Sequence, residues 1–180
     1  MTIKVPSVPL TYVIGTVGLL VILGIVTLIA TTEGVALQGE TTQNSLFDAA
    51  QYVSNEITGL VSSIPSGQTG TIYYKLVLPQ ELNLRGYAIN LSYISGQWQV
   101  LAYVPNNPSL SAKMPLPFQP NNVIQGSSIC VYLANGNPNK CSSPSASVNP
   151  LPQIYSGDAK AVVWAYISGQ SITIGIGDMN

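Results

Sequence analysis

The chain has 180 residues and carries little charge: six Lys and Arg against seven Asp and Glu, no His, and a formal net charge of −1. So few positive charges exclude a basic surface for nucleic acid. The lack of His removes the commonest general base and metal ligand in proteins. We therefore expect no nucleic-acid partner and no His-dependent chemistry.

The first element along the chain is an uncharged apolar run. No Asp, Glu, Lys or Arg occurs from Val5 to Thr32, and Tyr12–Ala30 is apolar apart from Gly and Thr. About 20 such residues in helical form cross the hydrocarbon of a bilayer. We predict a membrane-spanning helix with its N-terminus inside the cell, because Lys4 and the terminal amine are the nearest positive charges. A cleaved secretory signal fits less well, because the run is too long.

Three glycines interrupt this run, at Gly15, Gly18 and Gly24. Small residues let neighbouring helices approach one another closely in a membrane or a helix bundle. We interpret them as a helix-packing surface; the alternative is the ordinary frequency of Gly in membrane helices.

An amphipathic helical pattern follows the run. Between the two, Thr31–Ser45 contains Gly34 and Gly39, which lower helix propensity, so a hinge there is the alternative to a continuous helix. We predict one helix from about Ser7 to about Ser63. Its second half would pack on the rest of the chain through one apolar face with spacings of three and four residues. That face consists of Leu46, Ala50, Val53, Ile57, Leu60, Val61 and Ile64.

The pattern changes from helical to alternating after Gly70, as is typical of strands. The turn Ser95-Gly96 predicts a hairpin across 87–104. The Pro-rich stretch 105–120 reads as loop, with a short edge strand near Ala112–Leu116. The remaining strands are expected at Thr71–Leu78, Ser127–Leu133, Ala159–Ile167 and Ser171–Ile176, and 135–152 as a long loop.

The predicted fold class is α+β. A long N-terminal helix, hydrophobic and then amphipathic, is followed by a small antiparallel β-sandwich or barrel. The expected divisions are 1–64 for the helix, 65–70 for a linker, and 71–180 for an extracellular β domain.

Two covalent features are predicted within the β domain. Cys130 and Cys141 flank a turn-rich loop and are expected to form a disulfide, with two unpaired thiols as the alternative. Asn90-Leu91-Ser92 is a sequon, so Asn90 is a candidate glycan acceptor, with an unmodified strand residue as the alternative.

No catalytic, cofactor or metal constellation is recognisable in the sequence. Glu81, Asp158 and Asp178 are scattered and read as solvated loop carboxylates. The phosphate-binding pattern GxxxxGK[ST] and the nucleophile elbow GxSxG are both absent. We therefore expect a non-enzyme with no cofactor and no metal.

The layout resembles the type IV pilin family, in particular its archaeal class of pilus and archaeal flagellum subunits. The resemblance rests on Val5–Ile64 and on the segment IYYKLVLPQELNLRGYAINLS, which is similar in style to the β domains of archaeal pilin-like proteins. It implies a membrane protein with a single span. An assembly ATPase and a membrane platform protein would extract it into an extracellular helical homopolymer at the cell surface. The filament would serve adhesion to a surface or glycan. The resemblance also implies a filament core built by Tyr12, Gly15, Gly18, Leu19, Ile22, Gly24, Ile25 and Ile29.

Two features depart from the family pattern, and other functions stay open. Lys4-Val5 is only an approximate match to a leader-peptidase site, and no acid precedes Glu33. The main alternative is a membrane-anchored β module that serves as a filament-motor anchor or binds the surface layer. A minor pilin that primes assembly, and an enzyme, are further alternatives.

Overall fold

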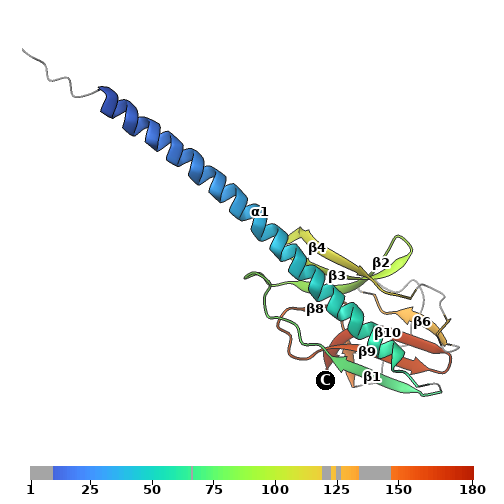
Figure 1. The fold of residues 1–180 in the computed structure, drawn as a ribbon. Coiled ribbons are helices and arrows are strands. Elements are labelled where there is room, and N and C mark those ends of the chain that lie inside the picture. Colours follow the sequence, from blue (N-terminus) through green and yellow to red (C-terminus); the bar gives the residue numbers. More distant parts are fainter. Residues whose placement is uncertain (1–9, 66, 119–122, 125–126, 134–146) are drawn as a thin grey trace, which may run out of the picture. The chain divides into compact units, whose positions relative to one another are not determined.

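The computed structural model describes residues 10–65, 67–118, 123–124, 127–133 and 147–180, which form an α+β fold (Figure 1). These residues contain one helix and ten strands. Helix α1 spans Leu10–Ser62, so the segment Thr31–Ser45 lies within it. A short turn at Ser63 follows α1, where the Ser63 N–H donates to the carbonyl of Gly59.

The chain divides into two compact units, Met1–Glu40 and Thr41–Asn180. The boundary falls inside α1, whereas the sequence places it at 65–70. The physical reason is burial. The second unit buries side chains of α1 from Thr42 onward: Thr42 is 1 % exposed and Leu46 is 0 % exposed.

The second unit contains two sheets. The larger has the order β1-β9-β10-β6-β5, with β7 also paired to β10. Its strands are β1 (Gly70–Lys75), β5 (Val123–Ile124), β6 (Ser127–Val131), β7 (Val148–Pro150), β9 (Ala161–Ser168) and β10 (Ser171–Met179). The smaller sheet has the order β4-β3-β2-β8. Its strands are β2 (Ala88–Ile94), β3 (Gln97–Val104), β4 (Asn107–Pro115) and β8 (Gln153–Tyr155).

The predicted hairpin is confirmed: β2 and β3 pair antiparallel from Ala88↔Tyr103 to Ile94↔Gln97. Ser95 and Gly96 have φ of 52° and 83°, the left-handed values that a two-residue hairpin turn requires. One pair departs from the antiparallel prediction, because β6 and β10 run parallel. Parallel neighbours need a long crossover connection, and the chain between Val131 and Ser171 supplies it.

Two stretches predicted as loops contain strands. β4 occupies Asn107–Pro115, longer than the predicted edge strand, and it lies at the edge of its sheet. Edge strands tolerate proline because one side makes no ladder hydrogen bonds. The second stretch, 135–152, includes β7, and β8 follows directly.

One hydrophobic core joins α1 to both sheets. Ile57 from α1, Val100 from β3 and Ile174 from β10 are each 0 % exposed and belong to a single cluster. A second, smaller cluster of Val148, Val162 and Trp164 lies apart from it. The second half of α1 is therefore an integral part of the β unit.

Candidate functional site

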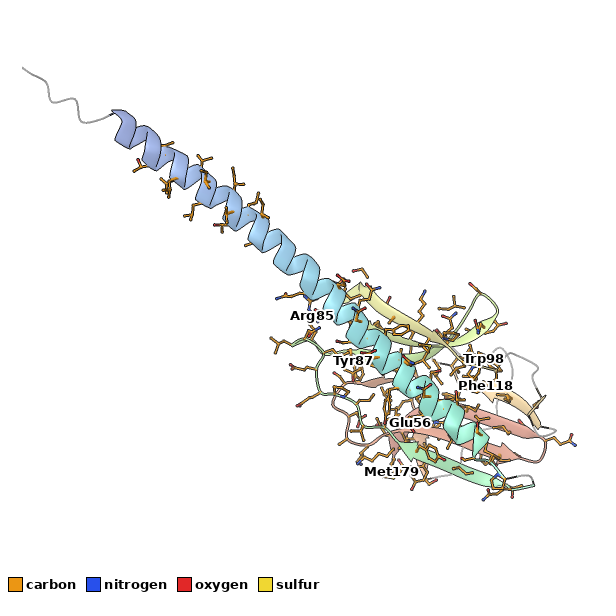
Figure 2. The ribbon with its side chains drawn as sticks, viewed as in Figure 1. Glu56, Arg85, Tyr87, Trp98, Phe118 and Met179 are labelled. Carbon is orange, nitrogen blue, oxygen red and sulfur yellow. The ribbon has the colours of Figure 1, made fainter. Side chains whose placement is uncertain are left out.

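The apolar part of α1 exposes its side chains. Between Val17 and Ile29 the large hydrophobic residues are 50 to 67 % exposed, and in Figure 2 their side chains project on several sides of the helix. They are Val17, Leu19, Leu20, Val21, Ile22, Leu23, Ile25, Val26, Leu28 and Ile29. An apolar surface of this extent is unusual on a soluble monomer and marks an interaction site.

The polar groups of this segment are satisfied within the helix. The Thr27 hydroxyl donates to the carbonyl of Leu23 at 2.7 Å, and the Thr31 hydroxyl donates to that of Leu28 at 2.9 Å. Such back-bonding leaves the methyl groups of threonine on the helix surface. The outward surface of the segment is therefore almost wholly apolar.

The three glycines of the apolar segment have open space beside them. A Cβ added at Gly15, Gly18 or Gly24 would meet no atom within 4 Å. Among the described residues, nothing packs against these three glycines. The other predicted packing residues, Leu19, Ile22, Ile25 and Ile29, are at least half exposed. The side chain of Tyr12 lies outside the described residues.

Within the described residues, no helix meets the length and apolarity that crossing a membrane requires.

The amphipathic half of α1 behaves differently. The seven residues predicted to face the β domain are 0 to 5 % exposed: Leu46, Ala50, Val53, Ile57, Leu60, Val61 and Ile64. Ser54 adds a polar contact, since its hydroxyl donates to the carbonyl of Pro115 at 3.4 Å. The structure thus places all seven of them in the core of the second unit.

The structure brings two acids together that the sequence treats as separate. Asp178 on β10 interacts with Asp158, whose Oδ1 accepts the N–H of Lys160 at 2.9 Å. Burial raises the pKa of Asp178, as do the hydrogen bond and charge of Asp158, while the charge of Lys160 opposes the shift. The described residues contain no group of three His, Cys, Asp or Glu suited to a metal ion.

The candidate glycan acceptor lies in the middle of a sheet. Asn90 is half-buried on β2 and faces Leu101 on one side and Gln153 on the other. Its Oδ1 and the Ser92 hydroxyl are buried and have no hydrogen-bond partner among the described residues. An amide within a paired strand is harder for a transferase to reach than one in a loop, and glycosylation at Asn90 stays a prediction.

Cys130 is disulfide-bonded. The sequence has one other cysteine, Cys141, which lies outside the described residues. Cys130 itself lies on β6, opposite Thr173 of β10.

Comparison of the chain with protein-family models, with curated proteins and with solved structures gives no match. Function must therefore be argued from the chain itself.

Proposed function

We propose that this chain is the structural subunit of an extracellular helical filament of the archaeal type IV pilus class. In this proposal, copies polymerise through the apolar part of α1, and the β domain, a small sandwich carried by the same helix, forms the outer surface. The observation that carries the proposal is the exposed, uncharged apolar surface between Val17 and Ile29.

The hydrophobic effect requires this surface to be covered once the chain has left the membrane. Burying one large aliphatic side chain contributes about 1.5 to 3 kcal/mol relative to leaving it in water. The segment exposes ten such side chains and contains no charge that burial would strand. A bundle of identical helices would cover them all.

The open glycines support close packing. Apolar burial alone does not distinguish one helix arrangement from another in a lipid-like environment, so shape must do so. Gly15, Gly18 and Gly24 leave the helix backbone accessible, and no described residue fills the space beside them. A neighbouring helix is the natural occupant.

The second half of α1 supports separate roles for the two halves of the helix, the first in polymerisation and the second in holding the β unit. Its apolar face is buried by the chain's own strands, so it is not available to a partner. Each copy that packs through Val17–Ile29 would therefore bring one folded β unit with it. The sparse charge of the chain limits repulsion between many identical copies.

Before assembly, the segment Tyr12–Ala30 would span the membrane. Extraction would then need an assembly ATPase and a platform protein. These steps rest on the uncharged run in the sequence and on the pilin resemblance.

The test is fractionation of cells that express the chain. Shearing releases surface filaments, which are pelleted away from washed membranes and probed with an antibody against residues 71–180. The proposal predicts that the chain is the main protein of the filament fraction. A chain that stays entirely with the membranes would contradict it and favour the membrane-anchored binding module.

A further inference from the structure

The segment between β1 and β2 holds the most exposed apolar side chains outside the apolar part of α1. Leu84 is 91 % exposed and Val77 is 77 % exposed. Leu84 sits in a tight turn in which Leu82 and Arg85 exchange backbone hydrogen bonds of 2.9 and 3.1 Å. An exposed leucine at the tip of a tight turn has no role in the core of its own chain.

The backbone at this turn is strained. Asn83 and Leu84 have φ of 50° and 63°. Asn tolerates the left-handed region, whereas a leucine there crowds its Cβ against the next carbonyl oxygen. Strain of this kind is frequently found at functional positions.

Hydrogen bonds hold the segment against α1. The Asn83 amide donates to the hydroxyl of Thr42 at 3.3 Å, and the N–H of Val77 donates to the hydroxyl of Tyr52 at 3.2 Å. Tyr87 donates its hydroxyl to the carbonyl of Pro79 at 3.0 Å. The exposed side chains are thus presented from a fixed backbone.

A groove of about 380 Å³ lies between this segment and α1. The segment contributes Val77, Leu78 and Leu82 to its lining, and α1 contributes Ser45, Ala49 and Tyr52. Ser45 and Ala49 are four residues apart, so these two small side chains lie on the same helix face. Small residues at this spacing allow another helix to approach α1 closely.

We propose that this groove binds the apolar part of α1, residues 17–29, from a second copy of the chain. The inference rests on the proposed function and names the contact between neighbouring subunits. The helix segment is apolar and exposed, and Val77, Leu78 and Leu82 give the groove an apolar wall. A helix that lays an apolar face into a groove is a recurring mode of recognition. Asp48 is the one charged residue that lines the groove, and the uncharged helix would bring no second acid beside it.

The groove and the helix segment also suit a polymer. Residues 17–29, Ser45 and Ala49 all belong to α1, so a helix that lies along the groove comes from another copy. The contact joins two different surfaces of the subunit. Contacts of this heterologous type propagate into open helical assemblies, whereas self-complementary contacts close into dimers.

Site-specific photo-crosslinking in sheared filaments tests the contact. A benzoylphenylalanine replaces Val77, which lines the groove and is 77 % exposed, and in a control chain it replaces Tyr93, which is 45 % exposed. Mass spectrometry of crosslinked dimers is expected to join position 77 to residues 17–29 of another copy, and position 93 to other residues. Filaments in which position 77 never links to 17–29 would overturn the inference and leave the filament proposal standing. Absence of the wild-type chain from filaments would overturn both.

A substitution pair provides the second test. Val77 is 77 % exposed and follows the end of β1, so the fold should persist in Val77→Asn, but an apolar contact in the groove is lost. The ratio of filament to membrane-bound protein should fall about tenfold, while Tyr93→Gln leaves it unchanged. Thermal unfolding of both variants establishes that they are folded. Wild-type assembly by folded Val77→Asn would overturn the inference.

Discussion

Trp164 of β9 lies across Gly175 of β10, its register partner in the larger sheet. The indole N–H donates to the carbonyl of Ile176 at 3.0 Å, and the side chain of Trp164 is fully buried. A Cβ at position 175 would overlap the indole ring. The glycine is therefore required by the close approach of the ring and not by a turn.

This relationship predicts the effect of adding one methyl group at position 175. Gly175→Ala should lower the free energy of unfolding by about 1 to 3 kcal/mol, because the indole must leave its position or the strands must separate. Gly59→Ala is the matched control, since a Cβ there meets nothing within 4 Å and alanine favours the helix. Urea unfolding compares the two; equal stability of Gly175→Ala and wild type would contradict the contact.

The strained turn predicts a stabilising substitution. Leu84→Asn should raise the free energy of unfolding by about 1 kcal/mol, because Asn accepts the left-handed backbone at lower cost. Leu82→Asn in the same turn should destabilise, since Leu82 is half-buried against the core. Thermal denaturation measures both, and a loss of stability in Leu84→Asn would show that Leu84 packs within its own chain.

The open helix surface predicts that Gly18→Leu separates folding from assembly. A Cβ at position 18 meets no described atom within 4 Å and leucine favours the helix, so the second unit should unfold at an unchanged temperature. Assembly should fail or give filaments of altered geometry, because neighbouring helices could no longer approach closely. Leu20→Ile, which conserves volume in the same segment, is the control. Electron microscopy of sheared material is the readout, and normal filaments from Gly18→Leu would refute the close-packing argument.

The Asp158–Asp178 pair predicts a pH dependence of stability. The pKa of Asp178 is raised above its ordinary 3.8 in the folded chain, so the folded state binds its proton more tightly than the unfolded state. This contribution to stability is complete below pH 3.8 and is lost as pH rises through the raised value.

Asp178→Asn should therefore flatten the fall in stability as pH rises above about 4. Glu81→Gln, at an exposed position on the segment between β1 and β2, is the control and should leave the slope as in wild type. Denaturant unfolding across this pH range gives the slopes. If the slope of stability against pH persists in Asp178→Asn, the pH dependence comes from another group.

Elements with a strong local pattern could be predicted from the sequence. The apolar face from Leu46 to Ile64 has helical spacing, and the structure buries it. The hairpin at Ser95-Gly96 combines alternating strands with residues that accept positive φ. Both features depend on neighbours that are close in the chain.

Other features depend on contacts between distant segments and carry no local pattern. Only the end of β4 was predicted, as a short edge strand, because its prolines favour a loop, yet an edge strand accommodates them. The parallel pairing of β6 with β10, and the meeting of Asp158 with Asp178, are set by the packing of the whole sheet. The left-handed backbone at Leu84 could not be foreseen, because leucine is disfavoured there.

Electron cryo-microscopy of filaments sheared from cells that express the chain tests the central claim most directly. The account predicts a filament core of bundled helices whose density fits the side chains of residues 17–29, with an outer layer that fits the strands of residues 70–180. It also predicts that Val77, in the groove of one subunit, contacts the core helix of another. Filaments built from a different protein, with this chain left in the membranes, would contradict the account.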